Sequence, residues 1–367
     1  MKTMKKSLKA LGWFLLLFLL YAITILVHGG LTDYQPEDVE QISIEQASPF
    51  HTIEDSTLSI LTWNIGYGGL GAEADFFYHG SGFLLAGEDM VRPSAELVNK
   101  YNNGINDFLK NNPADFILLQ EVDFDSKRSY HINQFEQFKN TLRPLAASKA
   151  LNFKVDRVPA PALQPWKAYG KCLSGLASFS RYQPTKSTRY QLPGVFDWPD
   201  KPFMLDRCLQ VSRFSVKDGK ELLVINVHNT AYEKDGKKKR QQLDFLKALI
   251  LPEYEKGNYV IVGGDWNQCP PGISKNHFNT MDISAYSNLN IPDNLLPAGW
   301  KWIFDPEVAT NRSTMDPFVE GKTFTALIDF FLVSPNIEAL SVKGVDMKFA
   351  FSDHQPVRID VRLGVGD

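Results

Sequence analysis

Polar side chains that can bind a cation or move a proton stand at or near the ends of six apolar runs. These runs are LTWN (61–64), LLQE (118–121), VINVHN (224–229), VIVGGDWN (260–267), LIDFFLVS (327–334) and FSDH (351–354). Strand ends carry many catalytic groups, because a rigid sheet holds them while the neighbouring loops admit a substrate. The inventory offers oxygen ligands for a divalent cation and two histidines for proton transfer, so it predicts metal-assisted hydrolysis.

The sharpest local pattern is VIVGGDWN. Gly263 and Gly264 permit a tight turn under Asp265, and Asn267 lies on the same side as Asp265 if the chain stays extended. Such a pair can orient a water molecule through the carboxylate while the amide donates to a phosphoryl oxygen. An Asx turn after a strand fits the same residues equally well.

Two further oxygen donors follow apolar runs directly. Glu121 comes after ILLQ, so we expect its carboxylate at the carboxyl-terminal tip of a strand, and Asn64 comes after LTW. Mg²⁺ takes oxygen ligands and is usually held by one or two carboxylates. Taken alone, a strand-end Glu is more often a surface residue, and an Asn more often caps a turn.

The remaining candidates combine acids with imidazoles. Asp353 and His354 are adjacent, so one can contact a metal while the other handles a proton. Asp329 interrupts an apolar run, and a buried carboxylate requires a partner, for which a histidine is the natural choice. His228 ends VINV; a lone histidine in such a place is usually structural, but two histidines at strand tips among acids indicate function.

Other sequence patterns are weaker evidence of function. The lysine and arginine run 237–240 is interpreted as a solvated helix start rather than a phosphate contact. Cys172, Cys208 and Cys269 lack metal-like spacing. Cys172 and Cys208 can pair in an oxidising compartment, although three free thiols are favoured.

Alternating apolar strands and amphipathic helices must position these groups. The apolar spacing predicts helices over 93–112 and 240–251. A hairpin is predicted at 217–220, where Lys-Asp-Gly-Lys joins two strands. The predicted strands are 58–63, 116–120, 176–182, 208–216, 221–227, 259–264, 327–333 and 357–363. Many strands with few helices indicate two packed sheets flanked by helices.

The amino terminus carries a membrane signal. Four lysines precede a charge-free apolar run over 11–27, and four acids follow it by residue 40. This length is at the lower edge of a spanning helix, and no small-residue cleavage site follows. We expect an uncleaved signal anchor rather than a cleaved signal peptide or a buried core helix. The charge asymmetry predicts a cytoplasmic amino terminus and an extracytoplasmic body.

Composition sets the domain plan. The chain has 367 residues, 44% of them hydrophobic and 22% charged, with a formal net charge of −3, so no global basic excess indicates a nucleic-acid groove. We expect a cytoplasmic basic segment (1–10), a signal anchor (11–30), a polar linker (31–56) and one catalytic domain (57–367).

Read in order, these segments resemble the endonuclease/exonuclease/phosphatase superfamily. Each motif is weak, but their shared order makes chance a poor explanation. The motifs are Trp63–Asn64, Gln120–Glu121, Ser180–Arg181, Asn226–His228, Gly264–Asp265–Asn267, Asp329–Phe330 and Ser352–Asp353–His354. The resemblance implies a deoxyribonuclease I-like, four-layer α/β/β/α sandwich of two mixed sheets. It also implies Glu121 as the principal Mg²⁺ ligand, with Asn64 and Asp353 nearby and Mn²⁺ as a substitute ion.

The same resemblance implies roles for the other residues. Asp265 positions or deprotonates the attacking water, and Asn267 holds the phosphoryl group. His354, braced by Asp329, stabilises the pentacovalent phosphorus or acts as a base. His228 contacts phosphate or protonates the leaving oxygen. Water then attacks in line, without a covalent enzyme intermediate.

Three functions remain open on these residues. The favoured one is a membrane-anchored phosphoesterase acting on a lipid head group or another small phosphoester. An extracytoplasmic nuclease of DNA or RNA is the close alternative, and a non-catalytic binding domain on the same fold is the third. No obligate protein partner is evident. Aromatic residues in variable stretches are candidates for contact with lipid or bases, although packing within the loops is favoured: Phe76, Phe77, Tyr78, Trp198 and Trp302.

Overall fold

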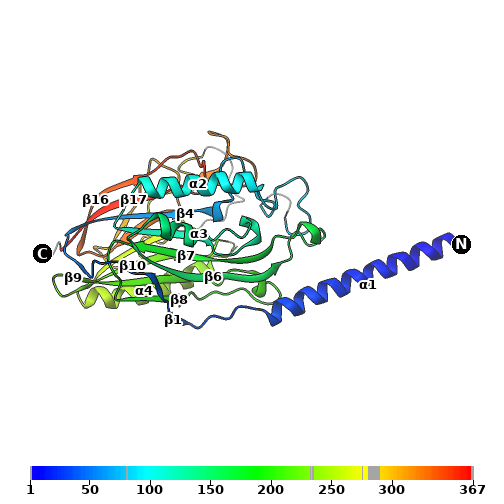
Figure 1. Cartoon of the computed structure of the whole chain (residues 1–367), viewed down its shortest axis with the longest axis horizontal. Coiled ribbons are helices and arrows are strands. Elements are labelled where there is room, and N and C mark those ends of the chain that lie inside the picture. The colour runs from blue at the N-terminus through cyan, green and yellow to red at the C-terminus, as the bar shows by residue number, and fades with distance from the viewer. Residues whose placement is uncertain are drawn as a thin grey trace.

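The computed structural model describes residues 2–79, 82–231, 233, 235–274, 276–279 and 290–364. A long amino-terminal helix projects from one end of a body in which two sheets lie face to face (Figure 1). The helices are α1 (Lys2–Leu31), α2 (Ala95–Asn111), α3 (Gln134–Thr141) and α4 (Lys237–Glu255). Short 3-10 turns are η1 (Gly66–Gly68), η2 (Lys127–Ser129), η3 (Pro165–Lys167) and η4 (Lys201–Phe203).

Within the described residues, an eight-stranded sheet has the order β1-β8-β9-β10-β11-β15-β12, with β3 paired to β9. A seven-stranded sheet has the order β16-β17-β4-β5-β7-β6-β2, and β13 pairs β14 separately. The first sheet comprises β1 (Val39–Gln41), β3 (Thr52–Ile53), β8 (Lys186–Gln191), β9 (Cys208–Val216), β10 (Glu221–His228), β11 (Tyr259–Asp265), β12 (Lys301–Ile303) and β15 (Asp329–Val333). The second comprises β2 (Ile44–Gln46), β4 (Thr57–Asn64), β5 (Phe116–Asp123), β6 (Ala146–Val158), β7 (Gly170–Ser180), β16 (Ile337–Gly344) and β17 (Val357–Leu363). The small pair is β13 (Asn311–Arg312) and β14 (Thr325–Ala326).

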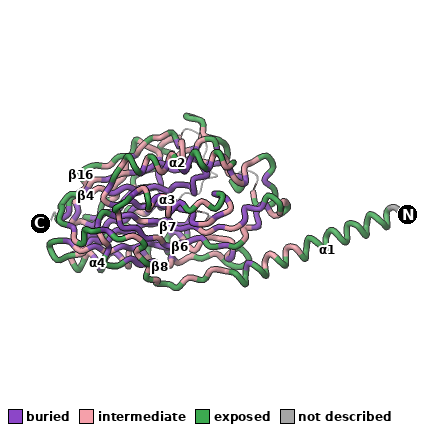
Figure 2. The backbone as a smooth tube through the Cα atoms, viewed as in Figure 1, coloured by how far each residue is buried: buried purple, intermediate pink, exposed green. Residues whose placement is uncertain are grey.

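Three apolar clusters hold the layers together. The central cluster joins the two sheets. In it, Phe116 of β5 packs against Phe214 of β9, and their ring centroids lie 5.0 Å apart. Helices α2 and α3 pack on the outer face of the seven-stranded sheet, and α4 packs on the outer face of the eight-stranded sheet. Figure 2 shows this burial concentrated in the strands. The predicted four-layer α/β/β/α sandwich is therefore confirmed.

Local signals explain where α2 begins and ends. The Ser94 hydroxyl accepts a hydrogen bond from the Leu97 amide at 3.3 Å, which caps a donor that the first turn leaves unpaired. The helix buries the side chains that repeat at three- and four-residue spacing, among them Tyr101 and Ile105. It stops just before Pro113, whose ring disfavours a helical conformation for the preceding residue.

The predicted linker, 31–56, differs from the structure. Part of it is bound to the body, because β1 pairs with β8, β2 pairs with β6 and β3 pairs with β9. Strands β8 and β6 would otherwise be sheet edges with unpaired backbone groups, and these short polar strands satisfy them. Composition alone identifies a polar segment but not the edge that it covers.

Helix α1 is long and apolar enough to cross a membrane, from Met4 to Leu31. Its apolar side chains are exposed along nearly its whole length (Figure 2). The body itself buries all three cysteines, Cys172, Cys208 and Cys269, as free thiols. The alternative of a Cys172–Cys208 disulfide is therefore absent from the structure.

Candidate active site

Two pairs of parallel strands end at the same edge of the sandwich. Asn64 is the last residue of β4 and aligns with Gln120 of β5, one residue before Glu121. His228 is the last residue of β10 and aligns with Asp265, the last residue of β11. Because parallel strands direct their carboxyl ends to one side, four predicted site residues from both sheets meet there.

Glu121 reaches the site through a distortion of β5. The register with β7 shifts between Leu119 and Val122, and Glu121 has a φ of 52°. A bulge of this kind re-aims a side chain, and left-handed backbone at a non-glycine residue persists where the surroundings enforce it. The Glu121 carboxylate accepts a hydrogen bond from the Asn64 amide at 3.3 Å. Glu121 thus lies within β5 rather than at the predicted tip, but at the predicted edge.

The chain after Asp265 turns rather than staying extended. Asp265 Oδ1 accepts a hydrogen bond from the Asn267 backbone amide at 2.9 Å, and Asn267 has a φ of 51°. This is the Asx turn that the sequence left as an alternative. The Asn267 side chain donates to the Asn229 carbonyl at 3.0 Å. The condition for placing Asp265 and Asn267 on one side, an extended chain, is therefore not met, because the aspartate closes the turn itself.

Lys239 stabilises this turn through a hydrogen bond to its backbone. Its ammonium donates to the Asn267 carbonyl at 2.9 Å, and its side chain is buried at the start of α4. Burial lowers the pKa of Lys239, while Glu233 and Asp265 favour its charged form. The prediction of a solvated charge run over 237–240 is therefore wrong at this residue.

Several side chains of the site lie around one atom, Asp265 Oδ2. It accepts a hydrogen bond from the Asn64 side-chain amide at 3.0 Å. It lies 3.4 Å from His228 Nε2 and 3.8 Å from His354 Nε2. Glu121 is also close, with Oε1 3.8 Å from His228 Nε2. Residues of β4, β10 and the loop before β17 thus surround one carboxylate oxygen, with Glu121 of β5 close to one of them.

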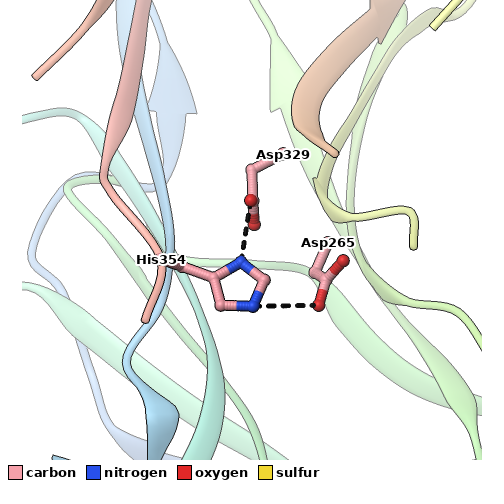
Figure 3. A group of neighbouring side chains, drawn as sticks. All are labelled: Asp265, Asp329 and His354. Atoms are coloured by element: carbon pink, nitrogen blue, oxygen red, sulfur yellow. Dashed lines mark hydrogen bonds and ion pairs between the residues drawn. The ribbon is translucent and has the colours of Figure 1, made fainter. Parts of the chain in front are cut away.

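His354 and Asp329 form a buried pair (Figure 3). His354 Nδ1 lies 2.8 Å from Asp329 Oδ2, and Figure 3 shows the imidazole between Asp329 and Asp265. Burial opposes the charged imidazole, but the two carboxylates outweigh it and hold the pKa of His354 well above its ordinary value. Burial also raises the pKa of Asp329. The bond to Asp329 therefore fixes the imidazole, with its Nε2 3.8 Å from Asp265 Oδ2.

His228 has the opposite character. Burial, together with the charges of Arg207 and His354, holds the pKa of His228 well below its ordinary value. Its Nδ1 has no hydrogen-bond partner within the described part of the chain. A neutral imidazole with Nε2 directed at the carboxylates can donate one hydrogen bond, and it is a poor source of a transferable proton.

Asp353 lies beside a glycine that leaves room for it. A Cβ at Gly66, whose φ is 49°, would lie 2.6 Å from Asp353 Oδ1. Burial raises the pKa of Asp353 to about 6, and the nearby charge of Glu121 adds to the effect of burial. Two carboxylates held this close disfavour each other's charged form, and a cation between them relieves that cost.

The donor atoms fit a hard divalent cation best on the Glu121 side. Asp265, Asp329 and His354 offer atoms within 4.8 Å of one another. However, both ring nitrogens of His354 already have neighbours, because Nδ1 lies 2.8 Å from Asp329 and Nε2 lies 3.0 Å from the Asn311 side-chain amide. Glu121 and Asp353 provide the oxygens that Mg²⁺ prefers. Asn64 is held in place, because its Oδ1 accepts from the Gly66 amide at 3.0 Å while its amide donates to the carboxylates, and its role as a metal ligand stays a prediction.

Sequence reasoning missed two groups at this edge. The Asn311 side-chain amide lies 3.0 Å from His354 Nε2, at the start of the two-residue strand β13, whose sequence gives no signal. The buried Arg128 pairs with Asp123 at 2.8 Å and lies 3.9 Å from the Tyr67 ring centroid. An arginine five residues past the end of β5 is the only sequence hint of this second pair.

Comparison with known proteins agrees with this geometry. The sequence model of the Endonuclease/Exonuclease/phosphatase family matches residues 61–354, which is most of the chain. The chain therefore belongs to that family. Family members are phosphoesterases and nucleases that depend on divalent metal ions, and the chain is an enzyme that acts on phosphoric ester bonds.

Solved structures share the fold at low sequence identity. An endonuclease/exonuclease/phosphatase from Beutenbergia cavernae has a TM-score of 0.56 at 16% identity, covering 84% of this chain and 72% of that one. ANGEL2, a 2′,3′-cyclic phosphatase, has a TM-score of 0.53 at 14% identity, covering 90% and 99%. Humanized D. rerio TDP2 has a TM-score of 0.51 at 13% identity, covering 84% and 100%. Among curated proteins, no sequence matches the chain.

Proposed function

We propose that the chain is a membrane-anchored, divalent-metal-dependent phosphoesterase. It hydrolyses a phosphodiester or phosphomonoester, on a lipid head group or another small phosphoester, by in-line attack of water. The observation that carries this proposal is the convergence on Asp265 Oδ2 of Asn64 at 3.0 Å, His228 at 3.4 Å and His354 at 3.8 Å. Glu121 and Asp353 complete the oxygen-rich side of the same edge.

The residues divide the chemistry between them. Glu121 and Asp353 hold Mg²⁺, for which Mn²⁺ is a substitute; the bound ion supplies Lewis acidity at a phosphoryl oxygen. Asp265 orients the attacking water, because its Oδ2 faces the centre of the site while its Oδ1 is engaged by the turn. His354, fixed by Asp329, donates to the developing negative charge on phosphorus. His228 donates a hydrogen bond to the phosphoryl group.

Asn64 and Asn267 act as positioning residues in this scheme. Asn64 holds the Glu121 and Asp265 carboxylates at a fixed separation through one amide. Asn267 fixes the turn through its bonds to Asp265 and Asn229. Prearranged donors of this kind need not reorganise during the reaction, which is the main source of electrostatic catalysis.

The membrane anchor rests on α1. Its apolar helix from Met4 to Leu31 is exposed, as a segment in lipid must be. Lysines precede the apolar run and acids follow it, which favours a cytoplasmic amino terminus and an extracytoplasmic catalytic body. A tethered body of net acidic charge favours a lipid or small phosphoester over nucleic acid.

The test is a substrate panel with the full chain in detergent. It comprises bis-p-nitrophenyl phosphate, sphingomyelin, a 2′,3′-cyclic nucleotide and DNA, each with Mg²⁺ and with chelator. We expect hydrolysis that requires the metal and that falls on the order of a hundredfold or more in Glu121→Gln. Glu338→Gln is the matched control, because Glu338 is a strand glutamate paired with Arg362 far from the site.

Three outcomes of this panel count against parts of the proposal. Full activity in Glu121→Gln contradicts the metal assignment. A strong preference for DNA shows that the chain is a nuclease rather than a hydrolase of a lipid or small phosphoester. Inactivity on every phosphoester, with the metal bound, favours a binding domain on this fold.

A further inference from the structure

An exposed apolar patch lies on two loops at the end of the body that bears α1. The patch consists of Phe83, Leu84, Leu85, Leu163 and Trp166, which are between 41% and 73% exposed. The loops are joined, because the Ala162 and Leu163 amides donate to the Phe83 and Leu84 carbonyls at 2.9 and 3.0 Å. Contiguous exposed apolar side chains mark a surface that contacts a partner or a membrane.

Basic side chains lie directly behind this patch. Arg157 donates to the Pro165 carbonyl at 3.0 Å, which ties the patch loop to β6. Lys127 lies against Gly170, and its pKa is lowered by burial and by the nearby charges of Arg92 and Arg157. Lys171 adds a further cation, which pairs with Asp125. We name Arg92, Lys127, Arg157 and Lys171 the basic cluster.

Helix α1 runs past the basic cluster. A cavity of about 570 Å³ lies between them, lined on the helix by Tyr21, Thr24, Ile25 and His28 and on the body by Lys127, Asp156, Arg157, Gly170 and Lys171. These helix residues form the carboxyl-terminal part of the apolar run and its end. If α1 spans a bilayer, the basic cluster is therefore at the level of the lipid head groups, and the loops with the patch lie beside them (Figure 1).

The active-site edge faces the same way. Strand β4 ends at Asn64 with its arrow directed toward the end of the body from which α1 projects (Figure 1). The loop that bears Trp166 also reaches this edge. Tyr169 follows Trp166 by three residues, and its ring centroid lies 6.4 Å from that of Tyr67, which is beside the site. The patch, the basic cluster and the candidate active site thus share one face of the body.

We infer that this face is a second membrane contact: the patch inserts into the bilayer, and the basic cluster binds anionic phospholipid head groups. An apolar tip rimmed by cations matches a membrane surface of negative charge. The contact holds the active-site edge toward the lipid and so favours a phospholipid as the substrate. The inference rests on the anchoring part of the proposed function, since without α1 in the bilayer nothing fixes this face against it.

The test measures how deeply single positions lie in a bilayer. Three full-length variants, Leu16→Cys, Leu84→Cys and Leu340→Cys, each receive a fluorescent label; the native cysteines are buried and react slowly. Leu16 reports on α1, and Leu340 is an exposed apolar residue on β16, at the opposite end of the body. Each variant is placed in vesicles that contain nitroxide-labelled lipid, made either of phosphatidylcholine alone or of phosphatidylcholine and phosphatidylglycerol in equal parts.

We expect lipid quenching at positions 16 and 84 and none at 340, with quenching at 84 stronger in the anionic vesicles. Adding Lys127→Gln and Lys171→Gln should remove that lipid dependence, whereas the control Lys343→Gln on β16 should not. Quenching at 16 but not at 84 overturns the second contact and leaves the anchor standing. No quenching at 16 overturns the anchor itself. Equal quenching at 84 in both vesicles overturns the assignment to anionic head groups.

Discussion

At the scale of single residues, the site is built where the backbone departs from regular strand geometry. Gly66, Glu121 and Asn267 all have positive φ angles, of 49°, 52° and 51°. Each directs a group to the same edge: Glu121 through a bulge, Asn267 through an Asx turn and Gly66 by making room for Asp353. A positive φ costs stability at the two non-glycine residues, Glu121 and Asn267, and such positions are retained at functional sites.

The Asp329–His354 pair gives the first prediction. Asp329→Asn keeps the shape of the side chain but removes the charge that holds the imidazole protonated. We expect kcat to fall on the order of a hundredfold or more, with the pKa of His354 shifted downward in an NMR titration of the imidazole. Asp360→Asn, at a strand aspartate paired with Arg358, is the control. Parental kcat in Asp329→Asn would refute the role of the pair.

Gly66 gives the second prediction. A methyl group there would lie 2.6 Å from Asp353 Oδ1, so Gly66→Ala should displace a metal-binding carboxylate. We expect the Mg²⁺ concentration for half-maximal activity to rise. Gly219→Ala is the control. Gly219 also has a positive φ, of 82°, but open space surrounds it, so this substitution should cost only about 1 kcal/mol of stability. An unchanged Mg²⁺ requirement in Gly66→Ala counts against Asp353 as a ligand.

The residue types of the site could be predicted from the sequence, but their geometry could not. All eight predicted residues lie at one edge, because strand ends and their polar tips are encoded locally. The bulge at Glu121 and the turn at Asn267 depend on contacts with other strands, so no local pattern announces them. Lys239 was misjudged for the same reason, since its partner is a carbonyl 28 residues away.

At the scale of elements, the strand pairings place the site and the helices brace it. Asn64 and His228 are brought together only because β4 and β10 belong to facing sheets. One inter-sheet bond is Gln120 Nε2 to Asn226 Oδ1, at 2.7 Å. By contrast, Ser180–Arg181 of the family pattern lies at the opposite end of β7, where Arg181 pairs with Asp115 at 3.2 Å. That motif therefore marks the fold rather than the site.

A polar network that ties α4 to β9 gives the third prediction. Burial disfavours charge on Glu253, but bonds from Arg213, Lys256 and Asn258 outweigh it and lower its pKa to about 2. A depressed carboxyl pKa stabilises the fold above about pH 4.5, and this stability is lost as the pH falls toward 2. Arg213→Met should remove about 1 kcal/mol at neutral pH, since the pair is partly exposed, and less in acid.

Chemical unfolding followed by tryptophan fluorescence measures this difference. The free energy of unfolding of the parent chain should approach that of Arg213→Met as the pH is lowered from neutrality to about 3. Arg362→Met is the control, because its partner Glu338 is surface-exposed. A difference between parent and Arg213→Met that stays constant with pH would contradict the network.

The elements themselves were largely predictable. The helix over 93–112 and the strands over 208–216 and 357–363 agree with α2, β9 and β17, because their apolar spacing is strong and their ends carry turn residues. The strands inside the expected linker were missed, since three-residue edge strands have no periodicity to detect. Their existence depends on the open edges of β6 and β8.

At the scale of the whole molecule, the chain combines a long apolar helix and a catalytic body, and the candidate active-site edge faces the end of the body from which that helix projects. Helix α1 leaves the body at the end opposite the carboxyl terminus (Figure 1). The polar segment after α1 does not run free, because β1, β2 and β3 are paired with the body. These pairings limit how far the body can turn relative to α1.

The anchor gives the fourth prediction, which concerns topology. In intact cells that produce the full chain, a membrane-impermeant maleimide should label Leu340→Cys and should not label Thr3→Cys. The charge asymmetry around α1 is the physical reason. After permeabilisation both positions should react. Labelling of Thr3→Cys alone in intact cells would place the body in the cytoplasm.

The most direct test of the central claim is Mn²⁺ binding to the full chain, measured by electron paramagnetic resonance, in the parent, Glu121→Gln and His354→Asn. We expect that the parent binds Mn²⁺ and that Glu121→Gln binds it far more weakly. We also expect that His354→Asn still binds the ion, although its phosphoesterase activity is lost. Parental Mn²⁺ binding in Glu121→Gln, or its loss in His354→Asn, would contradict the division between an oxygen-rich metal side and a histidine side.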